Sequence, residues 1–277
     1  MDVRYSPDQN GFKKLGTEEL RKSFLIDDLF QKNKISMTYS DVDRSITGSA
    51  VPYGKTLKLV ATKNEMASKF FTERREVGII NIGESGSIKV NNNIYILNNK
   101  DGFYIGRGEK TIEFKSKSTT KPAMFYFVSY PAHTAYPDKH VSFAKSTKRN
   151  LGSVRDANKR IINQYFHPGI MKTCQLVMGL TELDEGSVWN TMPAHTHQRR
   201  SEVYMYFNLE PESLVVHILG EPTETRHIII RDKQAVLSTS WSMHSGVGTK
   251  NYSFIWAMGG ENQAFDDMDW IPIQTLK

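Results

Sequence analysis

Two histidines and a glutamate in residues 193–203 have a spacing suited to a metal ion. On an extended strand His195 and His197 have the same parity, so both imidazoles project from one face and can reach one ion. Glu202 has the opposite parity and can join them only if the chain bends between them. The polar residues 198–201 are suited to that bend, so we expect a strand, a turn and a second strand that together carry three ligands.

A fourth ligand must come from elsewhere in the chain, and His244, close to the turn residue Gly246, is the candidate. Three imidazoles and one carboxylate suit Zn²⁺, Mn²⁺, Fe²⁺ or Co²⁺, and water can complete the shell. Histidines two apart on a strand are often only polar surface residues, so the argument depends on Glu202 and His244 joining them. We interpret His217 and His227, which lie in apolar runs, as structural.

The composition is that of an ordinary globular protein, with 39% hydrophobic and 24% charged residues among 277. The net charge is +6, but the basic residues are scattered among polar loops and no DNA-recognition helix or zinc-finger pattern accompanies them. We therefore expect no nucleic-acid partner, and positive charge that attracts small anions. No apolar run is long enough for a membrane span or a signal peptide, and the single Cys174 cannot form an internal disulfide, so we expect a cytoplasmic protein.

The pattern along the chain is mainly β. Thr17 can cap a short helix whose apolar stripe is Leu20, Phe24 and Leu29. From about Ser36 onward the chain consists of short strand-like runs separated by Gly, Asn, Asp and Pro. These runs are VGIINI (77–82), SIKV (87–90), IYIL (94–97), MFYFV (124–128), LVVHIL (214–219), HIII (227–230) and YSFIW (252–256). Many short strands with frequent turns predict a sandwich or barrel rather than a βαβ fold.

The chain also contains a weak internal repeat. The segment ERREV (73–77) resembles QRRSEV (198–203), and MFYF (124–127) resembles SFIW (253–256), at separations of 125 and 129 residues. A duplicated β-barrel explains this spacing, and chance similarity of aromatic strands is the alternative. We expect residues 1–150, with the amino-terminal helix, to form a barrel without metal and residues 151–277 to form the metal-bearing barrel. Residues 145–158 are the expected connection.

The pattern H-x-H-x4-E followed by a remote H resembles the metal motifs of the cupin superfamily, whose fold is a double-stranded β-helix or jelly-roll barrel. Most of the chain is similar to the 5-keto-4-deoxyuronate isomerase family, also called 4-deoxy-L-threo-5-hexosulose-uronate ketol-isomerase. The segments that carry this resemblance are FTERREVGIINIG (71–83), TCQL (173–176), MGLTEL (178–183), WNTMP (189–193), ETRH (224–227), HSGVGTK (244–250), GENQ (260–263) and FDDMD (265–269).

The resemblance implies a cytoplasmic homohexamer with one zinc ion per subunit, held by His195, His197, Glu202 and His244. It also implies a small-molecule uronate substrate, 5-dehydro-4-deoxy-D-glucuronate, which is isomerised to 3-deoxy-D-glycero-2,5-hexodiulosonate in pectin breakdown. The amino-terminal half has residues 71–73, Phe-Thr-Glu, in the region where the second half has its HxH, so we expect no metal there.

This reaction needs a polarised carbonyl, a proton transfer between neighbouring carbons and an anchor for the substrate carboxylate. A bound metal supplies the first as a Lewis acid. The candidates for the proton-transfer group are Tyr204, Asp266 and Asp267. The candidates for the anchor are Arg199, Arg226 and Lys250, although each arginine could equally form a structural salt bridge.

Two other functions are compatible with the metal motif. A cupin dioxygenase would use iron with the same ligands and consume oxygen, and a non-enzymatic sugar-binding cupin module would normally be joined to a DNA-binding domain. No helix-turn-helix candidate is visible in the sequence. Neither alternative explains the resemblance outside the metal motif.

Overall fold

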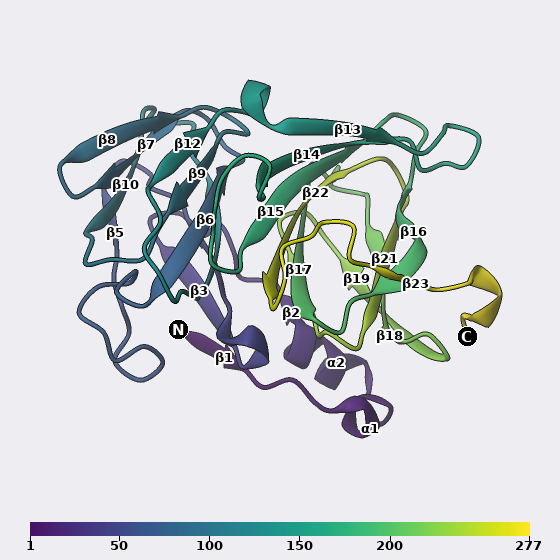
Figure 1. The fold of residues 1–277 in the computed structure, drawn as a ribbon. Coiled ribbons are helices and arrows are strands. Elements are labelled where there is room, and N and C mark those ends of the chain that lie inside the picture. Colours follow the sequence, from purple (N-terminus) through teal and green to yellow (C-terminus); the bar gives the residue numbers. More distant parts are fainter. The chain divides into compact units, whose positions relative to one another are not determined.

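The computed structural model describes all residues, Met1–Lys277, and most of its regular structure is β-strand. The helical elements are α1 (Gln9–Phe12), α2 (Thr17–Phe24) and the 3-10 turns Val42–Arg44, Phe143–Lys145 and Ile273–Thr275. The first strands are β1 (Asp2–Arg4), β2 (Leu25–Ile26), β3 (Ile35–Ser40), β4 (Ile46–Ala50), β5 (Leu57–Leu59), β6 (Arg75–Asn81), β7 (Gly86–Val90), β8 (Asn93–Leu97), β9 (Gly102–Ile105), β10 (Ile112–Ser116), β11 (Phe125–Pro131) and β12 (Lys139–Val141) (Figure 1). The remaining strands are β13 (Thr147–Leu151), β14 (Arg160–Phe166), β15 (Val177–Leu183), β16 (Trp189–Thr196), β17 (Arg200–Phe207), β18 (Val215–Glu221), β19 (Glu224–Ile230), β20 (Ala235–Ser238), β21 (Met243–Gly248), β22 (Ser253–Gly260) and β23 (Asp269–Trp270).

The chain divides into two compact units, each built from several stretches. Unit 1 comprises Met1–Val3, Asp28–Ser146 and Tyr165–Leu176. Unit 2 comprises Arg4–Asp27, Thr147–Gln164 and Val177–Lys277. This division differs from the expected one at residue 150 in two places: the amino-terminal helix belongs to unit 2, and residues 165–176 belong to unit 1.

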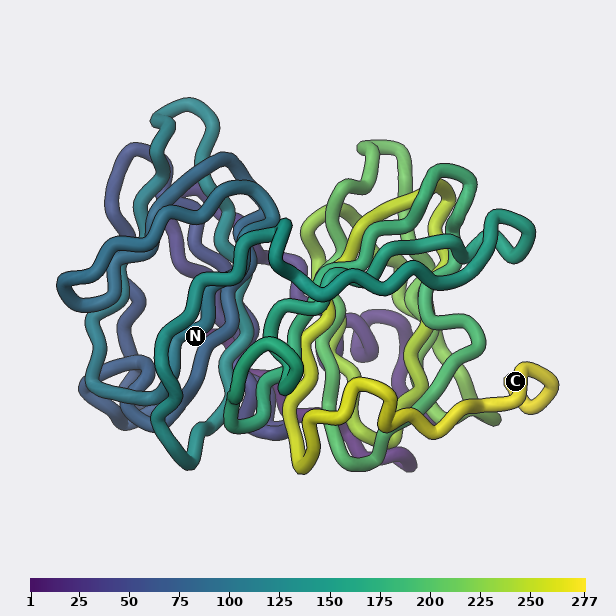
Figure 2. Tube along the Cα trace, turned by 45° about the horizontal axis from the view of Figure 1, so that its top comes forward, coloured from purple at the N-terminus to yellow at the C-terminus, as the bar shows by residue number.

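The expected helix is α2, and its apolar side chains Leu20 and Phe24 are buried, but it ends at Phe24 and so does not include Leu29. It begins after Gly16, whose backbone N–H donates to the Glu19 carboxylate at 2.9 Å, so Thr17 is the first helical residue and not the cap. Helix α2 packs against β19 and β20, and the following β2 pairs with β20. In Figure 2 this purple segment lies beside green strands of unit 2. Helix α2 belongs to unit 2 because the strands it packs against, β19 and β20, belong to that unit.

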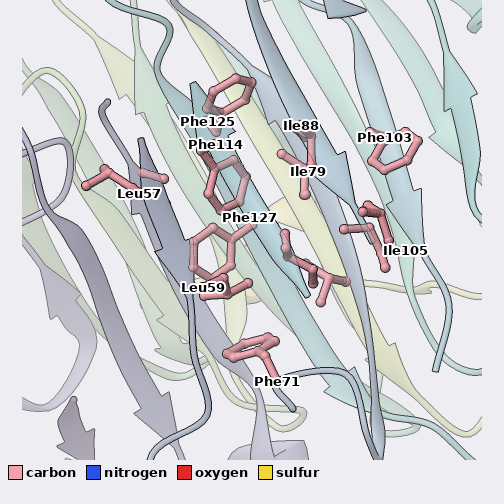
Figure 3. Packing of buried hydrophobic residues seen from close by; sticks show 14 of the residues in the cluster. Leu57, Leu59, Phe71, Ile79, Ile88, Phe103, Ile105, Phe114, Phe125 and Phe127 are labelled. Carbon is pink, nitrogen blue, oxygen red and sulfur yellow. The ribbon is translucent and has the colours of Figure 1, made fainter. Parts of the chain in front are cut away.

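Unit 1 is an antiparallel β-structure with an apolar interior. One sheet has the order β1-β3-β4-β11-β6-β9-β12 and the other β5-β10-β7-β8. Buried apolar side chains from both sheets form one cluster, in which Phe114, Phe125 and Phe127 lie beside Leu57 and Leu59 (Figure 3). The ring centroids of Phe114 and Phe125 are 5.1 Å apart. Side chains therefore fill the interior of unit 1.

Unit 2 repeats the topology of unit 1. Its sheets have the orders β13-β14-β15-β22-β17-β20-β2 and β19-β18-β21-β16-β23. The strand sets β4-β11-β6-β9 and β5-β10-β7-β8 of unit 1 recur as β15-β22-β17-β20 and β16-β21-β18-β19. The predicted fold class, mainly β with duplicated cupin-type jelly-roll barrels and a short amino-terminal helix, is confirmed.

The segment 145–158 was expected to connect the two halves, and the chain does pass from unit 1 to unit 2 within it, between Ser146 and Thr147. Residues Thr147–Leu151 form β13, which pairs in register with β14 at the edge of the larger sheet of unit 2. Because β14 is also sheet-bonded, this basic stretch forms part of the wall of unit 2 rather than a free linker.

No helix in the structure has the length and apolar character that a membrane span requires.

Candidate metal centre

Four buried side chains of unit 2 converge on one point. His195 near the end of β16 lies opposite His244 of β21 in the strand register, and Glu202 lies on β17. His197 follows β16, in the turn that leads into β17. The candidate ligand atoms of these four residues all lie within 4.8 Å of one another, and every one of the side chains is buried. The expected bend between His197 and Glu202 is therefore the turn from β16 to β17.

The hydrogen bonds around the cluster turn ring lone pairs toward its centre. Nδ1 of His197 lies 2.9 Å from the Arg200 carbonyl oxygen, which can only accept, so Nδ1 carries the proton. In the neutral ring Nε2 then presents a lone pair, and it faces Oε2 of Glu202 at 3.1 Å. Two acceptors at this distance favour either an added proton or a shared cation, and the carbonyl contact is of the kind that orients metal-binding histidines.

The other two imidazoles agree with a cation at the centre. Nε2 of His244 lies 2.9 Å from Oε2 of Glu202 but has no hydrogen-bond partner by geometry, and Nδ1 of His195 is also buried without a partner. Nδ1 of His244 is 3.2 Å from the Ser238 hydroxyl, which can orient the ring. A buried, unpartnered nitrogen beside a carboxylate, such as Nε2 of His244, is costly unless a ligand completes it, so the donor set fits a divalent metal.

The electrostatics keep His195 and Glu202 in a ligand-competent state. Burial, and then the neighbouring His244, lowers the pKa of His195 to about 2, so the ring is neutral at physiological pH. Burial acts to raise the pKa of Glu202, but the interactions with His244 and His197 outweigh it and hold the pKa below its usual value. Metal ligands must be unprotonated imidazoles and carboxylates, which are the forms that these shifts favour for His195 and Glu202.

The cluster opens onto a cavity of about 250 Å³ whose walls all belong to unit 2. His195 and Glu202 line it together with aromatic side chains. The lining aromatic residues are Tyr204, Phe254, Trp256, Phe265 and Trp270. A largely apolar pocket with a few convergent polar groups is the usual form of a small-molecule site.

Two of the expected proton-transfer candidates line this cavity. The Tyr204 hydroxyl is 3.1 Å from the Thr191 hydroxyl, and its ring is 5.2 Å from that of His244. Burial, and then the charge of Glu202, raises the pKa of Tyr204 well above its usual value, so the hydroxyl stays protonated. Asp266 also lines the cavity, with a largely exposed carboxylate 3.1 Å from Nη1 of Arg149.

Asp267 and Arg199 are not among the residues that line the cavity, and they are paired with each other. Nε of Arg199 donates to Asp267 at 2.8 Å and Nη2 donates to Asp269 at 2.9 Å. The Arg199 hydrogen bond, and then that of Asn262, lowers the pKa of Asp267 to about 2. These ion pairs leave Asp267 a weak base and Arg199 already neutralised.

The other two anchor candidates also lie outside the cavity lining. Arg226 on β19 pairs with Glu224 at 2.7 Å and donates to the Lys13 carbonyl at 3.0 Å. Lys250, in the loop after β21, pairs with Glu210. Both cations therefore have structural partners, and the prediction that they contact substrate is not supported by their placement.

Two arginines that sequence reasoning missed line the cavity instead. They are Arg149 on β13 and Arg160 at the start of β14. Arg149 pairs with Asp266 and lies over the Phe265 ring at 5.1 Å, whereas Arg160 donates to the Asn158 carbonyl at 2.7 Å and has no acidic partner. For Arg149 the only available signal was the basic character of residues 145–158, which suggested a connection between the halves, and Arg160 lies outside that segment.

The model of the KduI/IolB family matches residues 25–273. A protein of Lachnoclostridium phytofermentans named 4-deoxy-L-threo-5-hexosulose-uronate ketol-isomerase is 52% identical, with 100% of both chains covered. A protein of the same name from Caldicellulosiruptor bescii is 50% identical, again with 100% of both chains covered.

Similar solved structures have lower sequence identity and bear on the fold alone. A crystal structure of an IolB-like protein from Salmonella typhimurium superposes with a TM-score of 0.73 at 11% identity, covering 90% of this chain and 96% of the other. The YlbA protein of E. coli gives a TM-score of 0.56 at 12% identity, covering 85% and 89%. The family match spans nearly the whole chain, and the relatives align with it from end to end. The chain therefore belongs to the KduI/IolB family.

Proposed function

We propose that this chain is a metal-dependent 4-deoxy-L-threo-5-hexosulose-uronate ketol-isomerase that converts 5-dehydro-4-deoxy-D-glucuronate to 3-deoxy-D-glycero-2,5-hexodiulosonate in pectin breakdown. The observation that carries the proposal is the convergence of His195, His197, Glu202 and His244 at a cavity, in a chain 52% identical over its full length to a protein of that name. The same four residues are the proposed ligands of one divalent ion, with Zn²⁺ the proposed metal.

The reaction moves a carbonyl to the neighbouring carbon without net oxidation. A bound divalent ion supplies Lewis-acid polarisation of the carbonyl and the adjacent hydroxyl oxygen. Tyr204 lines the cavity as a protonated phenol, which suits it to donate a hydrogen bond or a proton to a substrate oxygen.

Asp266 is the proposed proton acceptor among the residues that line the cavity. Its carboxylate is exposed and its single ion pair, with Arg149, lies in solvent, where such a pair is weak. Asp267 is a poorer base because its carboxylate is held ionised by Arg199 and Asn262. Asp266→Asn should therefore lower kcat much more than it raises KM.

The direct test follows the sugar by NMR. The purified chain is loaded with Zn²⁺ and incubated anaerobically with the unsaturated-uronate breakdown product, and we expect the ketose to accumulate. Chelation should abolish turnover, and Glu202→Gln, which keeps the shape and removes the charge, should lower both metal affinity and rate. Product formation that requires iron and consumes oxygen would instead identify a dioxygenase, and binding without turnover would identify a non-enzymatic sugar-binding module.

The same proposal includes a homohexamer and a cytoplasmic location, both of which derive from the family resemblance. The free thiol of Cys174 agrees with a reducing compartment. Sedimentation equilibrium of the purified chain checks the oligomer, since a stable monomer or dimer would contradict it. Fractionation of the source cells checks the location.

A further inference from the structure

The cavity of unit 2 contains one guanidinium without a counter-charge. Arg160 is half-buried in the cavity wall, and its described hydrogen bond runs from Nη1 to the Asn158 carbonyl at 2.7 Å. A guanidinium has five N–H donors, and Arg160 forms no ion pair in this structure. Four donors of a permanently charged group therefore remain for a ligand or for water.

Arg149 of the cavity lining and Arg199 of the turn after β16 each have acidic partners. Arg199 holds Asp267 and Asp269, and Arg149 holds Asp266. Burial, opposed by Tyr204 and then Tyr252, lowers the pKa of Arg160, so the protein itself does not offset the cost of its charge. A buried charge without a partner is unfavourable, and a bound anion would compensate it.

Tyr204 and Arg160 line the cavity onto which the metal cluster opens. The Tyr204 ring packs against His244 at 5.2 Å, and Tyr204, Arg160 and Glu202 all line the cavity. Arg160 and Glu202 nevertheless form no ion pair, although both line the cavity. The cavity thus has a carboxylate-and-imidazole cluster and a separate cation, with space for a ligand that contacts both.

We propose that Arg160 binds the carboxylate of the substrate and makes the site selective for uronates over neutral sugars. This inference rests on the proposed function, because a substrate with a carbonyl at one end and a carboxylate at the other would contact the metal centre and the guanidinium together. A planar guanidinium can bind a carboxylate through two parallel hydrogen bonds, which also fixes the direction in which the substrate enters.

The test compares binding of D-glucuronate with binding of D-glucose by calorimetry, using the full-length, metal-loaded chain. The unaltered chain should prefer glucuronate, and Arg160→Gln should reduce that preference by roughly 10- to 100-fold, as expected for a hydrogen bond to a charged group. Gln keeps a donor for the Asn158 carbonyl, so the strand end should persist. Arg160→Lys keeps the charge without the planar fork and should lose part of the preference. Arg155→Gln, an exposed arginine in the preceding loop, is the matched control and should change nothing.

Steady-state kinetics on the uronate substrate give an independent readout. Arg160→Gln should raise KM by a similar factor, with a smaller change in kcat and unchanged metal content. An unaltered preference for glucuronate in Arg160→Gln, or equal loss in Arg155→Gln, would overturn the inference. If glucuronate selectivity depends on Arg160 but the chain does not isomerise the uronate, the inference about Arg160 holds and the proposed function is wrong.

Discussion

The two barrels of this chain have the same strand order but opposite kinds of interior. In unit 1 the strand register sets Leu57 of β5 opposite Phe114 of β10. In unit 2 it sets His195 of β16 opposite His244 of β21. Since β5 and β10 correspond to β16 and β21 in the sheet order, an apolar pair occupies the place of two candidate ligands.

The third and fourth ligand positions follow the same rule. Leu59 is two residues after Leu57, as His197 is two residues after His195, so Leu59 corresponds to His197. Val77 is two residues after Arg75, the first residue of β6, and Glu202 is two residues after Arg200, the first residue of β17. Val77 therefore corresponds to Glu202. Leu57, Leu59, Val77 and Phe114 all belong to the apolar cluster of unit 1. The segment that replaces the HxH is therefore Leu57–Leu59 and not residues 71–73, as the sequence analysis supposed. One backbone supports a packed core or a polar pocket, and the inward-facing residues decide which.

Each unit also buries a glutamate near the start of an equivalent strand, with a different outcome. Glu76 of β6 accepts hydrogen bonds from the backbone N–H groups of Cys174, Gln175 and Leu176 and from the Tyr104 hydroxyl, at 2.7 to 2.8 Å. Glu202 instead faces two imidazoles. A buried carboxylate saturated by N–H and O–H donors anchors the chain, whereas one that faces ring nitrogens is available to a cation.

The largest expected effect is loss of metal from unit 2. We predict that His195→Ala and His244→Ala each weaken binding of a divalent ion by more than about 100-fold, because even changes to groups that only orient metal ligands cost 10- to 100-fold. Elemental analysis after dialysis measures this. His140→Ala, in unit 1, is the control, and full occupancy in the two cluster variants would reject the ligand assignment.

A matched pair of phenylalanines tests the difference between the interiors. Phe125 lies opposite Asn81 of β6, and Phe254 lies opposite Tyr206 of β17. Asn81 and Tyr206 are each six residues after the first residue of their strand, so the two phenylalanines occupy equivalent places. Phe125→Ala should destabilise the protein by about 3–5 kcal/mol because it opens a hole in a filled core. Phe254→Ala should cost less, since Phe254 already borders the cavity. Urea unfolding compares them, and equal losses would mean that the interior of unit 2 is as closely packed as that of unit 1.

The two buried glutamates can be separated by one conservative change each. Each oxygen of Glu76 accepts two hydrogen bonds, so in either orientation the NH₂ group of a glutamine there would face at least one backbone N–H donor. Glu76→Gln should therefore lower the free energy of unfolding by about 2–4 kcal/mol and leave the metal content unchanged. Glu202→Gln should show the converse pattern, and loss of metal in Glu76→Gln without loss of stability would contradict this distinction.

The smallest expected effect, counted per pH unit, is a pH dependence specific to the polar interior. His217 is fully buried, its Nδ1 lies 2.7 Å from the Tyr206 hydroxyl, and burial, and then His244, lowers its pKa to about 3 from 6.5. Between these values the unfolded chain binds the proton and the folded chain does not, so stability rises with pH. On acidification stability falls from about pH 6.5 toward pH 3.

The contribution of His217 is at most about 1.4 kcal/mol per pH unit in that window. His217→Gln should flatten the slope relative to the unaltered chain, with both proteins stripped of metal so that ligand protonation does not interfere. Thermal unfolding at several pH values measures this. Parallel curves for the two proteins would show that His217 is not the responsible group.

The sequence by itself determined the features that depend on local spacing. Parity places His195 and His197 on one face, the polar run before Glu202 allows the chain to turn, and the apolar periodicity of Leu20 and Phe24 defines the helix. The repeat of aromatic strands at nearly constant spacing predicted two barrels, because each strand must bury one face.

Only the tertiary structure decided which charged groups reach the cavity. Arg199 is only two residues from His197, yet it points to Asp267 and Asp269, while Arg160 enters the cavity from a strand far away in the sequence. An ion pair between residues that are distant in the sequence forms only once the sheets have closed, and the same holds for the place of a strand in the barrel wall. No local sequence pattern therefore encodes either feature. For the same reason α2 packs on unit 2, because the strands that cover its apolar stripe, β19 and β20, come together only when that barrel forms.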